Sequence, residues 1–285
     1  MSVVFLCVGA AKAGTSWLHS QLAVHPGCHF RSIKELHYFD ALDEGTMSRN
    51  LQRMRARQVA LLERTNGGLN ATPEQAARIA DGGDWMDVLE RGGEDIGAYL
   101  GYLSEGATSG QVVGETTPAY ALLSADRLAR MARMAQDVRF LYLMRDPVDR
   151  LWSHVRMIAG RRDADGVVSA RRCERILSRT ISGEESQIVR RSDYAGALKR
   201  LAAAVPGGKL LIEVFEEMVS GEGLARICDF LGIGRVAPSP APVHAGQALA
   251  MSPDQRRRAA HWLAPQYEAA HAALGRMPEA WGRKV

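Results

Sequence analysis

The chain has 285 residues, which is enough to bury a full hydrophobic core as one α/β domain. It is 46% hydrophobic and 24% charged, as is usual for a globular protein, and no apolar run approaches the roughly 18 residues of a membrane-spanning helix. The net charge of +4 comes from scattered arginines rather than from a basic stripe with interleaved aromatic residues, so we expect an anionic small ligand and no nucleic acid.

The N-terminal apolar run is short and no basic stretch precedes it, so we expect no signal peptide. The cysteines Cys7, Cys28, Cys173 and Cys228 form no C-x-x-C pair, which favours free thiols in a reducing compartment. These features predict a cytoplasmic protein without a transmembrane segment. They leave open whether it forms a homodimer.

The first motif joins a strand, a glycine loop and a helix. Residues 3–8 are apolar and rich in β-branched types, which predicts a buried strand of a parallel sheet that ends at Gly9. Thr15 and Ser16 then open an amphipathic helix. Free backbone N–H groups and the positive end of the helix dipole meet there, so the motif predicts an anion site. The spacing matches a nucleotide-binding P-loop, but Thr15 replaces its lysine and Lys12 lies inside the loop.

The remaining chain alternates predicted helices and strands. Residues 41–110 read as a helical insertion that could face the substrate, and residues 124–136 and 253–274 as further helices. Strands are expected at residues 112–115, 138–144 and 209–215. We therefore predict one α/β domain over residues 1–285, with a P-loop-like, three-layer fold in which helices flank a central parallel sheet.

Two further motifs carry polar side chains. Between residues 30 and 40, Glu35, His37 and Asp40 alternate with apolar and aromatic residues. Arg145 stands at the carboxyl end of the strand 138–144, where α/β sheets bind ligands, and Ser153 follows on the next predicted helix. We expect Arg145 and Ser153 to lie close enough to hold one phosphate together.

These motifs together resemble the sulfotransferases that use 3'-phosphoadenosine 5'-phosphosulfate (PAPS). Lys12 to Trp17 resembles their K-x-G-T-[ST] loop, and residues 35–40 resemble the E-V-H-F-F-D segment of the glycosaminoglycan sulfotransferases. Arg145 to Ser153 resembles the family's R-D-P-x-x-R-x-x-S motif for the 3'-phosphate. The resemblance covers about residues 3–40 and 112–232. It implies transfer of a sulfonate from PAPS to the hydroxyl of a small-molecule, glycan or lipid acceptor by in-line displacement, with release of PAP and no metal.

The resemblance also implies roles for individual residues. The donor site would contain Lys12, Ala13, Gly14, Thr15, Ser16, Trp17, Arg145 and Ser153. Lys12 would stabilise the bridging oxygen, the loop N–H groups would bind the 5'-phosphate, and Trp17 would stack on adenine.

Glu35 would be the general base, provided that burial raises its pKa toward neutrality. His37 would orient Glu35 or replace it as the base, and the sequence leaves this choice open.

The chain departs from the family pattern at two places. The element G-E-K-[TS]-P-x-Y has Thr116 in place of its lysine, which argues against a heavily sulfated or carboxylated glycan acceptor. The basic, glycine-containing loop that closes over the 3'-phosphate is not evident, and residues 244–247 are the candidate replacement.

Two other functions stay open at this point. A P-loop-type metabolite kinase would need a lysine at position 15 and an acidic residue for Mg²⁺ after a strand. A non-catalytic nucleotide- or RNA-binding module would use the basic surface but would have no need of a base such as Glu35.

Overall fold

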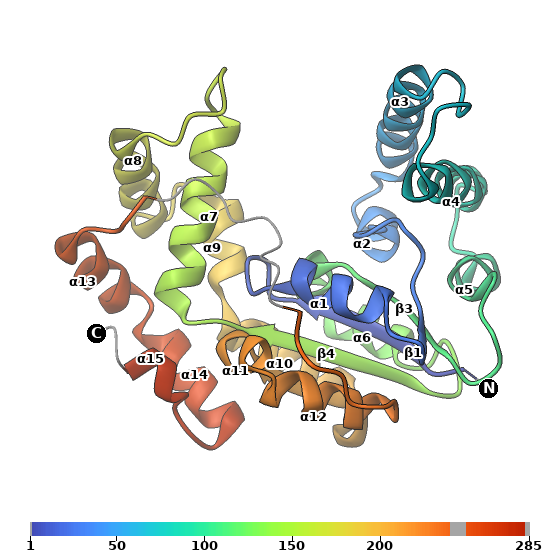
Figure 1. Ribbon diagram of the computed structural model, residues 1–285. Coiled ribbons are helices and arrows are strands. Elements are labelled where there is room, and N and C mark those ends of the chain that lie inside the picture. The colour runs from blue at the N-terminus through green and yellow to red at the C-terminus, as the bar shows by residue number, and fades with distance from the viewer. Residues whose placement is uncertain (1, 240–248, 283–285) are drawn as a thin grey trace.

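The computed structural model describes residues 2–239 and 249–282, and a five-stranded parallel sheet forms its centre (Figure 1). The strand order is β2-β3-β1-β4-β5. The strands are β1 Val4–Gly9, β2 Cys28–His29, β3 Val112–Thr116, β4 Val138–Met144 and β5 Leu210–Val214. The α/β fold with a central parallel sheet is therefore confirmed.

Helices surround the sheet on both faces and extend beyond it at both ends. They are α1 Thr15–Ala23, α2 Tyr38–Asp43, α3 Met47–Arg64, α4 Pro73–Glu90, α5 Ile96–Ser104, α6 Ala125–Met131, α7 Pro147–Arg161, α8 Ala170–Ile181, α9 Ser186–Ser192, α10 Tyr194–Ala204, α11 Phe215–Ser220, α12 Glu222–Leu231, α13 Pro253–Trp262, α14 Ala264–Leu274 and α15 Glu279–Gly282. Two short 3₁₀ turns, η1 Pro118–Leu122 and η2 Gly207–Lys209, complete the elements. In the view of Figure 1, α1 and α12 lie in front of the sheet, and α6 and α10 lie behind it.

The central strands are buried on both faces, which explains their nearly continuous apolar sequences. All residues of β1 are buried, and Arg139 alone in β4 is partly exposed. A second hydrophobic cluster lies outside the sheet, where α7, α8, α9 and α13 pack together around side chains such as Leu151, Cys173 and Ile188. This cluster fixes α7, whose first turns lead directly away from β4.

The strand order determines where the site forms. The connection after β1 leads to β2 at one side of the sheet, and the connection after β4 leads to β5 at the other side. Loops that leave neighbouring strands in opposite directions open a crevice at the carboxyl ends of those strands. Residues 10–14 and 145–146 border this crevice, so the fold brings the first and last sequence motifs together.

Two predicted helices differ from the structure. The predicted helix 253–274 is two helices, because the chain bends at Leu263. Pro265, which has no backbone N–H, lies in the first turn of α14. The predicted helix 124–136 ends at Met131, after which Arg133 and Met134 form tighter bonds to carbonyls three residues back.

The segment 41–110 contains the end of α2 together with α3, α4 and α5. The proposed closing segment 244–247 lies outside the described residues. Among the described helices, none is long and apolar enough to cross a membrane.

Candidate active site

The loop after β1 presents unsatisfied backbone N–H groups. Lys12 and Gly14 have positive φ angles of 71° and 87°, which turn the chain sharply into α1. Gly14 is the N-cap of α1, and no side chain caps the helix, so the first-turn N–H groups have no side-chain acceptor. Ala13 is buried and its N–H already donates to the Ala10 carbonyl at 3.1 Å. The groups left for an anion therefore begin after Ala13, through buried Thr15 and half-buried Ser16.

Position 14 has to be glycine in this arrangement. Besides the positive φ angle, a Cβ atom there would lie 2.2 Å from the ring of Phe215 at the start of α11. The same ring lies beneath the guanidinium of Arg145, 4.9 Å from its centroid. Phe215 thus packs the loop and Arg145 into one unit.

Arg145 lies at the carboxyl end of β4 and reaches the loop. Its Nη1 is 3.5 Å from the carbonyl oxygen of Lys12, and the hydroxyl of Tyr194 bonds to its backbone N–H and C=O at 3.1 and 2.8 Å. Its Nε is buried without a hydrogen-bond partner among the described residues. Ser153, in the second turn of α7, is half-buried. Arg145 therefore has an unused donor at the crevice.

Sequence reasoning did not assign a role to Arg150, although it is the second arginine of the R-D-P-x-x-R motif. Its side chain is fully buried, with Nη1 3.5 Å from the Ala11 carbonyl and Nη2 donating to the Ser192 hydroxyl. In the described part of the chain no carboxylate forms an ion pair with it. Burial lowers the pKa of Arg150, Tyr194 and Tyr142 oppose this lowering, and the charge of Arg145 adds to it. A buried cation without a counter-charge is costly unless an anion comes close.

Two titratable groups near Arg150, His154 and Lys12, also bring no negative charge. His154, one turn along α7, is buried, and its pKa falls to about 3 through burial and then through the charges of Arg150 and Arg191. Burial also lowers the pKa of Lys12, followed by the charges of Arg161 and Arg145. We call Lys12, Arg145 and Arg150 the donor-side cluster; it can hold a polyanion.

Trp17 has a different environment from the one predicted for an adenine-stacking residue. Its side chain is only 8% exposed, and its Nε1–H donates to the carbonyl of Ser239 at 3.3 Å. The ring therefore packs in the core of the structure. The backbone N–H of Trp17, in the first turn of α1, belongs to the anion-binding end of the helix.

On the other side of the crevice, the backbone around His37 is held in an unusual conformation. Glu35 and His37 have φ angles of 61° and 53°, in the left-handed region that side chains disfavour. The N–H of Leu36 donates to Glu115 Oε2 at 3.2 Å, and the N–H of Tyr38 donates to the hydroxyl of Tyr120 at 3.1 Å. These two bonds flank His37 and fix its direction.

Glu115, at the end of β3, anchors this turn from inside the core. It is 2% exposed, and its Oε1 accepts hydrogen bonds from Tyr99 and Tyr120 at 2.6 and 2.7 Å. Its Oε2 also accepts from the Thr117 hydroxyl. Burial raises the pKa of Glu115, although these bonds oppose the rise. Thr116, the position at which the resembling motif has lysine, is fully buried.

His37 lies between two carboxylates. Its Nδ1–H donates to Asp40 Oδ2 at 2.6 Å, and its Nε2 is 3.6 Å from Glu35 Oε2. Burial alone would lower the pKa of His37, but the bonds to Asp40 and Glu35 outweigh it and raise the pKa to about 9. His37 is therefore protonated at neutral pH.

The expectation that burial would raise the pKa of Glu35 toward neutrality is wrong. The side chain of Glu35 is 43% exposed and contacts both His37 and the ammonium group of Lys34. Burial acts to raise its pKa, but these two cationic neighbours outweigh it and lower the pKa to about 2. The charge of Glu35 also acts on Lys12, where it opposes the lowering of the Lys12 pKa.

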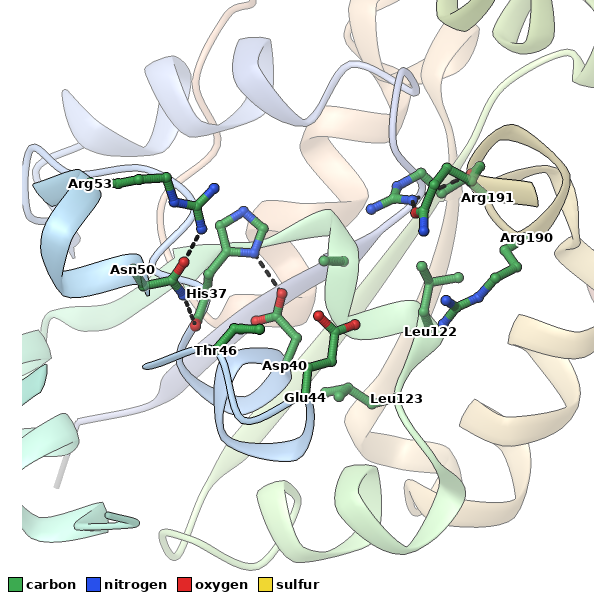
Figure 2. Close-up of a pocket in the computed structure, with 12 residues that line it drawn as sticks. His37, Asp40, Glu44, Thr46, Asn50, Arg53, Leu122, Leu123, Arg190 and Arg191 are labelled. Carbon is green, nitrogen blue, oxygen red and sulfur yellow. Dashed lines mark hydrogen bonds and ion pairs between the residues drawn. The ribbon is translucent and has the colours of Figure 1, made fainter. Parts of the chain in front are cut away.

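A polar pocket of about 210 Å³ adjoins His37 (Figure 2). One wall comes from α2 and α3, the opposite wall from α9, and η1 lies between them. We call it the His37 pocket, and it is lined by His37, Asp40, Glu44, Thr46, Asn50, Arg53, Ala119, Leu122, Leu123, Gln187, Arg190 and Arg191. No group of three His, Cys, Asp or Glu side chains within residues 2–239 and 249–282 is arranged to hold a metal ion.

Comparisons with known proteins agree with this arrangement. The chain is similar in fold to a sulfotransferase from Alicyclobacillus acidocaldarius, with a TM-score of 0.65 and 22% identity over 99% of both chains. It is also similar to the sulfotransferase domain from the curacin biosynthetic pathway, with a TM-score of 0.50 and 19% identity over 82% of this chain and 74% of that one. A search of curated proteins gave no match. A model of the sulfotransferase family matches residues 5–237, and the chain therefore belongs to that family.

Proposed function

We propose that this sulfotransferase moves a sulfonate group from PAPS to an acceptor hydroxyl by in-line displacement, and releases PAP. The observation that carries the proposal is the donor-side cluster, in which Lys12, Arg145 and Arg150 converge on the loop after β1. Within the described residues, no carboxylate forms an ion pair with any of them. The Nε of Arg145 and the N–H groups at the start of α1 are further donors that an anion could satisfy, and PAPS is a polyanion.

Each residue of the donor side has a separate task in this proposal. When bound, PAPS supplies the sulfonate and the phosphate oxygen from which it departs. The N–H groups from Gly14 to Trp17 bind the 5'-phosphate, and Arg145 and Ser153 bind the 3'-phosphate. Lys12 stabilises the negative charge that develops on the departing oxygen. Arg150 holds the loop carbonyl of Ala11 in place and adds to the positive field.

On the acceptor side, Glu35 accepts the proton, although its pKa of about 2 makes it a weaker base than a carboxylate with a raised pKa would be. The acceptor hydroxyl gives up this proton as its oxygen forms the new S–O bond and the old S–O bond to the donor phosphate breaks. Glu35 is ionised throughout the neutral range, whereas only about 1% of His37 is unprotonated at pH 7 when its pKa is about 9. His37 therefore serves to orient Glu35, and Asp40 fixes the imidazole.

The choice of donor predicts which nucleotide stabilises the protein. PAP should raise the melting temperature, since a ligand that binds only the folded state at about 100 times its Kd adds about 2.7 kcal/mol. ATP should act much more weakly, because it has no 3'-phosphate for Arg145, and EDTA should change nothing. Differential scanning fluorimetry measures all three. Equal stabilisation by ATP, or loss of the PAP effect in EDTA, would show that the proposed donor is wrong.

Removing Arg145 should weaken donor binding. We expect Arg145→Ala to raise the KM for PAPS by roughly ten- to a hundredfold, the scale of one or two charge-assisted hydrogen bonds, and Ser153→Ala to raise it less. Steady-state kinetics with varied PAPS measure the effect. Arg235→Ala, which removes an exposed arginine paired with Asp229, is the matched control and should keep the wild-type KM. A folded Arg145→Ala variant with normal PAPS affinity would contradict the assignment.

A further inference from the structure

We propose that the His37 pocket binds a small hydroxylated acceptor that carries an anionic group, either a carboxylate or a phosphate. This inference rests on the proposed function, because it names the class of molecule that receives the sulfonate. It also bears on the expectation from position 116, where the missing lysine argued against a heavily sulfated or carboxylated glycan acceptor.

The pocket adjoins the proposed proton acceptor. His37 forms part of its lining, and Glu35 Oε2 is 3.6 Å from His37 Nε2. A hydroxyl group at the His37 end of the pocket would thus lie beside the Glu35–His37 pair, and the charge of Glu35 also acts on Lys12. The volume of about 210 Å³ suits a small molecule or one terminal unit of a larger one.

The lining contains arginines that are available for an anion. Arg190 and Arg191 come from α9 and Arg53 comes from α3, and Figure 2 shows the α9 pair across the pocket from His37. In the part of the chain that the structure describes, none of these three has a carboxylate within ion-pair distance. Arg191 bonds to the amide of Gln187, and Arg53 bonds to that of Asn50.

Two other arginines of this region do have a carboxylate partner. Arg162, at the end of α7, and Arg179 of α8 both pair with Glu185, at 2.7 and 3.3 Å. The three pocket arginines lack such a partner in the described structure, and their charge supplies what a buried threonine at position 116 cannot provide.

The α2–α3 wall is mixed in sign, and its carboxylates favour one direction for the occupant. Asp40 and Glu44 lie there beside His37 and Arg53. The charges of the two carboxylates act on Arg191, where they oppose the lowering of its pKa by burial and by Arg190. An anionic group would point toward α9, and the hydroxyl toward His37. An apolar acceptor would cover the arginines without compensating their charge, which is unfavourable.

The inference can be tested with matched probes on protein saturated with PAP, so that the donor site is filled. The pairs are glucuronate against glucose and glycerol 3-phosphate against glycerol, with binding measured by isothermal titration calorimetry. In at least one pair, the charged member should bind at least about tenfold more tightly, as expected for charge-assisted hydrogen bonds. The pair that responds distinguishes a carboxylate from a phosphate. The preference should shrink as salt is added, since the arginines are partly exposed.

Two variants of nearly unchanged size should act in opposite directions. Arg190→Gln should remove most of the preference for the charged probe, whereas Glu44→Gln should increase it by removing a repelling charge from the same pocket. Arg257→Gln, an exposed arginine of α13, is the control and should have no effect. Equal binding of charged and neutral probes, or an Arg190→Gln variant that binds as the wild type does, would overturn the inference.

The same titrations separate this inference from the proposed function. The first addition of PAP reports donor binding, and absence of a PAP signal would overturn the donor assignment alone. A charge preference that depends on Arg190 would still locate an anion in the His37 pocket. Normal PAP binding without a charge preference would overturn the acceptor class and leave the donor assignment intact.

Discussion

Replacing Lys12 with alanine is expected to lower kcat by about a hundredfold or more, the usual scale for losing a group that stabilises charge in the transition state. The effect on PAP affinity should be smaller, because Arg145, Arg150 and the loop N–H groups remain. Burial removes water from the ammonium group of Lys12, which lowers its pKa. For the same reason its charge is weakly screened and acts strongly on a nearby anion. Turnover at saturating PAPS and calorimetric PAP binding measure the two effects separately.

The conservative variant Lys12→Arg is the control for charge. It should retain more activity than Lys12→Ala if the charge itself matters, although the larger head group will not place that charge identically. If Lys12→Ala weakens PAP binding greatly and leaves kcat unchanged at saturating PAPS, Lys12 binds the donor without stabilising the transition state.

Glu35→Gln is expected to cut kcat by about a hundredfold or more, the scale of a general base, and to leave PAP binding unchanged. Glutamine keeps the shape of Glu35 but cannot accept the proton. Because the pKa of Glu35 is about 2, it is ionised at every pH of a normal assay, so the wild-type rate should not rise between pH 5 and 8. A pH profile of kcat/KM for both proteins tests this assignment.

The alternative base gives the opposite profile. If His37 accepts the proton, activity requires its neutral form, and the rate should rise about tenfold per pH unit up to the pKa of about 9. Such a rise, lost in His37→Ala while Glu35→Gln keeps most of its activity, would show that His37 is the base. If both variants fold and keep full activity, neither residue accepts the proton.

The strands β1, β3, β4 and β5 and the loop after β1 could be predicted from the sequence because their signals are local, whereas the two-residue strand β2 could not. A buried parallel strand needs a continuous apolar run, which residues 3–8 and 138–144 provide. The position of Arg145 beside the Lys12 loop follows from the rule that loops at the carboxyl ends of parallel strands meet.

The rest depended on contacts between distant parts of the chain. The motif contains Arg150, but only the packing of α7 shows that its charge is buried without a carboxylate partner in the described structure. Likewise, Glu115 is separated from Leu36 by the whole helical segment, so no local pattern reveals the bond between them. The pKa of Glu35 was misjudged because the sequence shows the apolar neighbours of a carboxylate but not how its side chain is exposed.

The buried charge of Arg150 has a consequence for how long the protein survives. An interior cation without a counter-charge costs the native state several kcal/mol, so the empty chain opens more often and exposes its backbone to proteases. An anion held by the donor-side cluster offsets part of this cost and keeps the chain closed. If that anion is the donor, protein saturated with PAP should resist proteolysis longer than protein without it.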